Sequence, residues 1–172
     1  MLAILSPAKT LDYETPLTIS KSTQPDFNSE SKELISTLRK FAPAEIGSLM
    51  KISDNLAELN HRRYAEWQSA ANTGNARPAI FAFKGDVYQG LDAQTLVARD
   101  VNFAQKHLRV LSGLHGLLRP LDLIQPYRLE MGTRLTTRRG SNLYQFWGDK
   151  ITGSINEALA QQTSKVLVNL AS

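Results

Sequence analysis

Two glycines in the second half of the chain interrupt a long apolar stretch and constrain the fold more than any other feature. The stretch runs from Leu108 to Asp122, and Gly113 and Gly116 stand near its centre, each followed by leucine. Glycine adopts positive φ readily and lets other backbone approach closely, so the residues around these two positions are predicted to form a tight turn. The apolar residues that lead into the turn predict a buried strand at 108–111.

This turn has two interpretations. In the first, it is a structural turn between two buried elements. In the second, its backbone N–H groups point outward and bind a phosphate, as in the hairpin of helix-hairpin-helix DNA-binding elements, which the segment resembles. The residues predicted to contact DNA in the second interpretation are Arg109, Ser112, Gly113, His115, Gly116, Arg119 and Arg128.

A block of positive charge surrounds the turn. The net charge of the 172-residue chain is +4, and residues 106–139 hold seven Lys or Arg against two acidic residues. Six of the seven are arginine, whose forked guanidinium suits contacts to phosphate or carboxylate. Such a block is typical of proteins that bind a polyanion, and the alternative is a solvated basic face.

Short apolar runs alternate with helical patterns along the chain. Strands are predicted at 1–5, 78–83, 108–111 and 165–170, and helices at 29–41, 44–51, from Ser53 onward, at 101–107 and from 149 onward. This alternation predicts a mixed α/β (α+β) fold with a central, partly parallel sheet flanked by helices. No repeat or linker divides the sequence, so residues 1–172 are predicted to form a single domain.

Polar side chains follow the predicted strands where each strand ends. In open α/β sheets such loops gather at one edge of the sheet, where ligands bind. We therefore expect a pocket formed by Ser6, Lys9, Thr10, Lys84, Asp86, Tyr88, Ser112 and Asn169. A lysine directly after an apolar strand can act as a base, so Lys84 is the first catalytic candidate, with Lys9, Asp86 and Tyr88 as further candidates. The alternative for Lys84 is an ion-paired surface lysine.

Two other segments have open interpretations. Arg128 and Glu130 are predicted to share a strand face, where they form an ion pair or line a site in which Arg128 binds phosphate. Phe146 and Trp147 are predicted either to pack in the core or to stack on exposed bases.

Several kinds of site have no sequence support. Cysteine is absent, which excludes disulfides, thiolate nucleophiles and cysteine metal sites. The three histidines lack metal-ligand spacing, and neither a P-loop nor a dinucleotide fingerprint occurs, so neither a metal nor a cofactor is predicted. No run is long enough to span a bilayer and no signal peptide precedes the first strand, so we expect no membrane association.

Five segments together resemble the YaaA family of bacterial peroxide-stress proteins, and in particular its enterobacterial members. They are residues 5–11, 83–88, 111–122, 126–132 and 143–148, and the resemblance runs from Met1 to Ser172. It implies a cytoplasmic protein that protects against hydrogen peroxide, limits free intracellular iron and binds DNA through a basic cleft. It also implies a helix-hairpin-helix-like element, which the turn at 112–116 matches. Family members continue beyond the segment that matches 166–172, so we expect this chain to be shortened at its C-terminus.

The leading hypothesis is a non-catalytic stress protein that binds DNA through its backbone and shape. The rival is an enzyme that acts on a nucleotide or nucleobase in the strand-end pocket, because a backbone binder has no need of lysine, aspartate and tyrosine together in one pocket. Such an enzyme would take a small nucleotide-like ligand. Direct iron binding has the least support, because no set of histidine and carboxylate ligands is visible.

Overall fold

A four-stranded sheet forms the centre of the molecule in the computed structural model, which describes residues 1–171. The strand order is β6-β5-β1-β8, with β1 at Leu2–Leu5, β5 at Leu108–Ser112, β6 at Gly116–Leu118 and β8 at Leu167–Asn169. β1 pairs in parallel with β5 and β8, whereas β6 pairs antiparallel with β5. The predicted mixed fold with a partly parallel sheet is confirmed.

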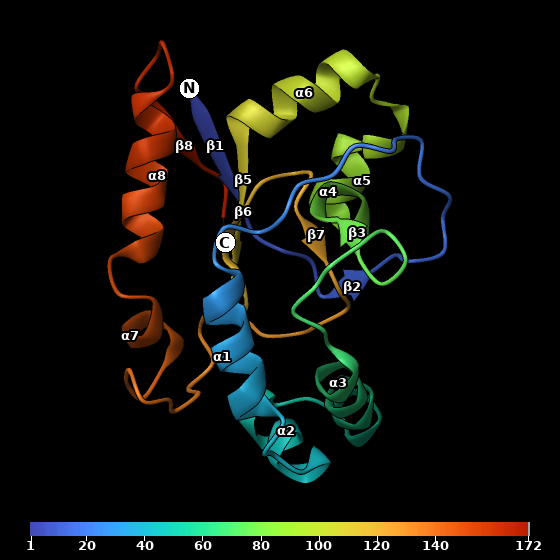
Figure 1. Cartoon of the computed structure of the whole chain (residues 1–172), viewed down its shortest axis with the longest axis vertical. Helices are drawn as coiled ribbons and strands as arrows, with labels where there is room; N and C mark the ends of the chain where they lie inside the picture. The colour runs from blue at the N-terminus through green and yellow to red at the C-terminus, as the bar shows by residue number, and fades with distance from the viewer. Residues whose placement is uncertain (172) are drawn as a thin grey trace.

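β1 is the inner strand of the parallel part, and its sequence reflects this position. Leu2, Ile4 and Leu5 are all buried. A near-continuous apolar run is typical of a parallel strand with both faces covered. In Figure 1, α8 (Lys150–Ala160) lies on one side of the sheet and α6 (Ala98–His107) on the other.

Three helices pack together at the lower end of the molecule in Figure 1. They are α1 (Asn28–Leu38), α2 (Pro43–Met50) and α3 (Asp54–Glu66), and all three match predicted helices. The apolar stripe of α1 is buried, as Leu34 and Leu38 show. Proline opens α2 because its fixed φ suits the first helical turn.

The prediction of one strand over 78–83 is wrong. This segment holds β3 (Arg77–Pro78), the single-turn helix α4 (Ala79–Ala82) and β4 (Phe83–Lys84). All residues from Ala79 to Phe83 are buried, so their hydrophobicity has no period that could separate strand from helix. Alanine at both ends of the turn favours the helix.

Two small antiparallel sheets flank the central one. β3 pairs with β7 (Leu123–Ile124), and β4 pairs with β2 (Thr10–Leu11). In the second pair Thr10 lies opposite Lys84. Lys84 is therefore placed by β2 and not by the edge of the central sheet.

A β-hairpin occupies the position at which a helix-hairpin-helix-like element was expected. β5 and β6 pair from Val110 opposite Leu118 to Ser112 opposite Gly116, and the turn lies between the last pair. The apolar residues on both sides of the turn thus pair as strands, and the helix before them, α6, ends at His107. The helix-hairpin-helix expectation is not confirmed.

The remaining elements are short. They are α5 at Asp86–Leu91, a 3₁₀ helix (η1) at Ala93–Thr95 and α7 at Leu143–Trp147. Phe146 and Trp147 of α7 are buried, so they belong to the core. Within residues 1–171, no helix has both the length and the apolar character needed to cross a membrane.

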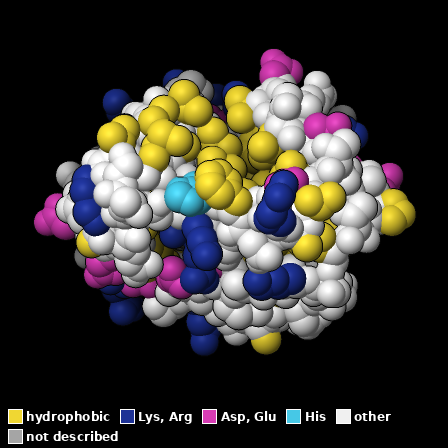
Figure 2. Space-filling model, turned by 90° about the horizontal axis from the view of Figure 1, so that it is seen from above, with side chains coloured by type: hydrophobic (Ala, Val, Ile, Leu, Met, Phe, Trp, Pro, Cys, Tyr) yellow, Lys and Arg dark blue, Asp and Glu magenta, His cyan; other side chains and the backbone are white. Residues whose placement is uncertain are grey.

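The end of the molecule that carries the N-terminus and α6 exposes apolar side chains. Figure 2 views this end and shows hydrophobic side chains gathered on it, with Lys and Arg side chains beside them. Large exposed hydrophobic residues of this end include Met1, Phe103, Val166 and Leu167. The basic residues seen here therefore lie next to apolar surface and do not form a purely basic face.

Candidate functional site

A pocket of about 560 Å³ lies beside the C-terminal ends of the three parallel strands. One wall is formed by residues that follow β1, and the opposite wall by residues 127–132, which have no regular secondary structure. The full lining is Ser6, Pro7, Ala8, Lys9, Phe83, Leu111, Gly113, Tyr127, Arg128, Leu129, Glu130, Met131, Gly132, Tyr144, Asn169 and Ala171. This is the sheet edge at which α/β proteins bind ligands.

Two cations of the pocket converge on one carboxylate oxygen. Arg128 Nη2 lies 3.0 Å from Glu130 Oε1, and Lys9 Nζ lies 3.8 Å from the same oxygen. The ion pair predicted between Arg128 and Glu130 is thus present, and it lines the pocket. Two positive charges against one negative charge leave this cluster with a net charge of +1.

The wall behind the cluster is a buried hydrogen-bonded pair. Tyr127 Oη lies 2.6 Å from Ser112 Oγ, and the backbone N–H of His115 donates to the same Oγ at 2.9 Å. Burial raises the pKa of the Tyr127 phenol, so it stays neutral at physiological pH. Ser112 is therefore a support of the wall and does not itself line the pocket.

The pocket gathers only part of the set predicted from sequence. Ser6, Lys9 and Asn169 line it, and the Tyr88 hydroxyl lies next to it because it donates to the Ser6 carbonyl at 2.8 Å. The predicted residues that do not line it are Thr10, Lys84, Asp86, Tyr88 and Ser112. Lys84 follows a helical turn and pairs with β2, so the topological argument that placed it at the edge of the central sheet does not hold.

The glycine turn packs inside the protein. Gly113, His115 and Gly116 are all buried, and so is Leu114 between them. A Cβ on Gly113 would lie 2.3 Å from the carbonyl oxygen of Leu129. Gly116 has a φ of +67°, and a Cβ there would lie 2.8 Å from the Trp147 ring. The turn is thus structural, in line with the first interpretation, and it does not present its N–H groups at the surface.

The buried imidazole of His115 has one side-chain partner. Its Nδ1 lies 3.0 Å from Ser31 Oγ, while Nε2 is buried without a hydrogen-bond partner among residues 1–171. Burial lowers the pKa of His115 to about 3, so the ring is neutral at physiological pH. A neutral, buried ring is not a phosphate contact.

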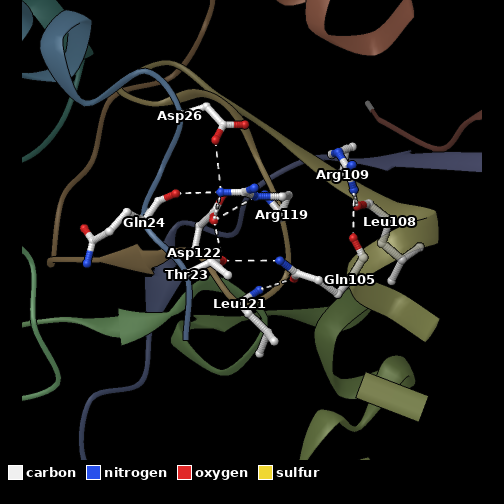
Figure 3. Close-up of polar contacts among 9 residues, drawn as sticks. All are labelled: Thr23, Gln24, Asp26, Gln105, Leu108, Arg109, Arg119, Leu121 and Asp122. Atoms are coloured by element: carbon white, nitrogen blue, oxygen red, sulfur yellow. Dashed lines mark hydrogen bonds and ion pairs between the residues drawn. The ribbon is translucent and has the colours of Figure 1, made fainter. Parts of the chain in front are cut away.

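Arg119 holds buried structure together. Its Nη2 lies 2.9 Å from Asp122 Oδ1 and 3.0 Å from Asp26 Oδ1, and it donates to the Gln24 carbonyl at 2.6 Å (Figure 3). The Asp122 side chain is fully buried and also accepts from Thr23 Oγ1. Burial raises the pKa of the Asp122 carboxyl, although the hydrogen bonds from Thr23 and Arg119 act in the opposite direction. The donors of Arg119 are thus largely occupied within the fold.

Arg109 is also directed inward. Its Nη1 donates to the backbone carbonyls of Gln105 and Leu108, at 3.0 and 2.7 Å (Figure 3). Burial lowers the pKa of Arg109 without removing its charge. The guanidinium thus closes the junction between α6 and β5.

The exposed cations of the basic block are fewer than the sequence suggests. Within residues 1–171, Lys106, Arg134 and Arg138 are exposed and have no acidic partner. Arg139, by contrast, pairs with Glu33 of α1. The other cations of the block bind acidic or carbonyl groups of the protein. The net charge of the block therefore overstates how many of its cations are available to a ligand.

A second, polar depression of about 400 Å³ lies between α1 and residues 136–138. Its lining consists of Glu33, Ser36, Thr37, Lys40, Thr136, Thr137 and Arg138. Of these, Glu33 is the acid paired with Arg139, which leaves two cations and four hydroxyls as the rest of the surface. We call this depression the α1 groove. Sequence analysis missed its α1 half, because that half lies about one hundred residues before residues 136–138 in the chain.

Comparison with known proteins identifies close relatives. The family model described as "Peroxide stress protein YaaA" matches residues 1–172. A UPF0246 protein of Aliivibrio fischeri strain MJ11 is 60% identical over 172 residues, and one of Tolumonas auensis is 61% identical over the same length. Each match covers all of this chain and 66% of the relative, so the chain spans slightly less than two thirds of these relatives.

Proposed function

The chain belongs to the family of the peroxide stress protein YaaA, and we propose that it protects DNA from peroxide damage by binding the DNA backbone. The α1 groove carries this proposal. Lys40 and Arg138 supply positive charge there, and the hydroxyls of Ser36, Thr37 and Thr136 supply further hydrogen-bonding groups. Most protein–DNA hydrogen bonds go to phosphate and sugar, and these are the side chains that make them.

The groove replaces the glycine turn as the proposed DNA contact. Ser112, Gly113, His115 and Gly116 are buried, and Arg109, Arg119 and Arg128 donate to groups within the fold. Lys40 and Arg138 have no acidic partner among residues 1–171, so a phosphate would not have to displace a protein carboxylate from them.

Salt dependence tests the proposal. Fluorescence anisotropy with a labelled duplex should give an affinity that falls steeply with salt, because bound cations release counterions from the phosphates. Lys40→Ala and Arg138→Ala should each reduce the magnitude of the slope of log K against log salt by about 1, for every DNA sequence. Arg99→Ala, at an exposed position of α6 outside the groove, is the control and should change little. Salt-independent binding, or equal effects of all three variants, would contradict the α1 groove.

The proposal extends to location and iron. We propose a cytoplasmic protein whose action accompanies a lower level of free intracellular iron, as the family resemblance implies. Among residues 1–171 there is no group of three His, Asp or Glu side chains placed to hold a metal ion. We propose that the protective step acts on DNA, and spin-resonance measurement of free iron in peroxide-treated cells would test the link to iron.

The strand-end pocket favours a second function, an enzyme that acts on a nucleotide or nucleobase. Lys9, Arg128 and Glu130 are charged side chains that line this pocket. A protein that only binds the DNA backbone does not require such a pocket. Lys9 takes the place of Lys84 as the candidate catalytic lysine, since only Lys9 lines the pocket. Release of base or phosphate from nucleotides by the purified chain, lost in Lys9→Ala, is the test.

A further inference from the structure

We propose that Lys9 and Arg128 form an anion cradle for the phosphate of a nucleoside monophosphate, and that Glu130 fills this cradle when the ligand is absent. The inference deepens the second proposed function, on whose pocket it rests. It concerns binding alone and needs no turnover. It also does not depend on DNA binding, because the α1 groove and the strand-end pocket share no residue.

The first observation is the shared oxygen. Arg128 Nη2 and Lys9 Nζ both approach Glu130 Oε1, at 3.0 and 3.8 Å. An anionic oxygen at this point is thus stabilised from two sides. A phosphate monoester carries a charge of about −1.5 to −2 near pH 7 and three acceptor oxygens. It can therefore satisfy both cations better than a single carboxylate can.

The second observation is the difference in solvent exposure of the three side chains. The Arg128 side chain is only 17% exposed, whereas those of Glu130 and Lys9 are 52% and 69% exposed. The Tyr64 hydroxyl donates to the Arg128 carbonyl and fixes the backbone below the guanidinium. Arg128 is thus a preset anchor, while Glu130 can turn into water at little cost.

The third observation is unused hydrogen-bonding capacity at the anchor. Within residues 1–171, the Arg128 guanidinium makes one hydrogen bond, from Nη2 to Glu130, and its Nε is buried without a partner. The arginine guanidinium can bind phosphate through two parallel N–H groups, and a single carboxylate oxygen engages only one of them. A phosphate in the cradle would engage more of this fork.

The rest of the pocket fits a flat ring. Phe83, Leu111 and Met131 supply apolar lining, and Tyr144, a residue that is 65% exposed, supplies an aromatic ring. Asn169 also lines the pocket, and its Oδ1 accepts from the Ala171 N–H, so its amide NH₂ is available as a donor. An apolar and aromatic wall with a few polar groups is typical of small-molecule sites, and aromatic side chains stack on bases. The volume of about 560 Å³ lies in the usual range for such sites.

The direction in which Glu130→Gln changes the ligand affinity distinguishes this proposal from the alternatives. If Glu130 competes with the ligand phosphate for the two cations, removing its charge must strengthen binding, while removing either cation must weaken it. If Glu130 is instead a ligand contact or a catalytic group, its removal weakens binding. If the three residues only stabilise the fold, all variants change unfolding and none changes affinity selectively.

Isothermal titration calorimetry of the chain with adenosine 5′-monophosphate is the experiment. Lys9→Ala should weaken binding about tenfold, as expected for loss of one charge-assisted contact. Glu130→Gln should strengthen it by a similar factor. Lys84→Ala is the matched control, because it removes an exposed lysine outside the pocket, and it should leave the affinity unchanged. Thermal unfolding of each variant checks that the fold is intact.

Two further titrations identify the part of the ligand that is recognised. Inorganic phosphate should bind more weakly than the nucleotide but show the same opposite effects of Lys9→Ala and Glu130→Gln. Adenosine should show neither effect. Absence of nucleotide binding at millimolar concentration, or weakening by Glu130→Gln, would overturn the cradle. Absence of turnover with intact binding would overturn only the enzymatic function.

Discussion

Arg119 and Asp122 form the most enclosed ion pair among residues 1–171. The Asp122 carboxylate is fully buried and is held by Arg119 and Thr23, so it depends on these two partners for its solvation. A buried charge that loses its partner is far more costly than the pair is stabilising. Arg119 is thus needed for folding before any role in binding can be considered.

Arg119→Met should lower the free energy of unfolding by about 3 to 5 kcal/mol, because it leaves the Asp122 carboxylate buried and unpaired. Urea denaturation measures this loss. The control is Asp122→Asn in the Arg119→Met background, which removes the orphaned charge but keeps an acceptor for the backbone N–H of residue 119. We expect the double variant to be more stable than Arg119→Met alone, and a further loss would rule out this explanation.

His115 makes stability depend on pH. Its pKa is lowered to about 3 by burial, against about 6.5 in an unfolded chain. At pH values between these two, the unfolded state binds a proton that the folded state does not. The contribution of His115 to the free energy of unfolding is therefore highest above pH 6.5 and falls as the pH is lowered. From pH 7 to pH 5 the loss should be about 2 kcal/mol. His115→Gln should remove this part of the pH dependence, as denaturation of both proteins at the two pH values would reveal.

The β5–β6 hairpin illustrates how one sequence pattern supports two interpretations. Gly113 and Gly116 indicate a turn that needs close backbone approach, and such a turn suits a phosphate or a packed interior equally well. Leu129 and Trp147 decide between them, since they lie against the two glycines. Both are distant in sequence, so no local pattern could reveal the packing.

Gly113→Ala should destabilise the protein by about 1 to 3 kcal/mol or more, because the new Cβ would meet the Leu129 carbonyl, which is backbone and cannot turn aside. Gly132→Ala is the control from the same region, since a Cβ there has no atom within 4 Å. Chemical denaturation should separate the two clearly. Equal stability of both variants would mean that Leu129 does not pack on the turn in solution.

The elements that sequence analysis located correctly are those with a clear hydrophobic period or run. Strands β1 and β8 and helix α1 are of this kind. Because the ends of β1 and β8 could be located, Lys9 and Asn169 could be expected at the pocket that they line. The two-residue strands β2 and β4 have no such signal, because they exist only through their pairing. For that reason the position of Lys84 could not be predicted.

The wall of the pocket that residues 127–132 form was harder to predict from sequence, for a different reason. Residues 127–132 have no regular structure, and they are held by contacts to distant segments, such as the hydrogen bond between Tyr127 and Ser112. Arg128 and Glu130 were recognised as a pair from their spacing. Lys9, which completes the cluster, comes from the other end of the chain.

The charge of the molecule as a whole is distributed in a way that composition does not reveal. Much of the basic block binds acids or carbonyls of the fold, as with Arg119 and with Arg139, which ties the segment before α7 to α1. Lys40 and Arg138, which have no acidic partner among residues 1–171, lie at the α1 groove, whereas Lys9 and Arg128 of the strand-end pocket share Glu130. In our two proposals these separate sites recognise phosphate in different contexts, one on an extended backbone and one on a small ligand.

The central sheet should not be uniformly stable, because β1 is paired on both edges while β8 is paired on one. β8 pairs with β1, and the N–H of Leu170, directly after β8, donates to the Ile4 carbonyl, yet Leu167 and Asn169 remain exposed. Hydrogen exchange with mass spectrometry should thus find amides of 167–170 opening locally, and those of β5 exchanging only through larger unfolding. Low urea should accelerate exchange in β5 but hardly in β8, since local opening exposes little surface. Equal protection and equal urea sensitivity in both strands would instead mean that β8 unfolds together with the core of the sheet.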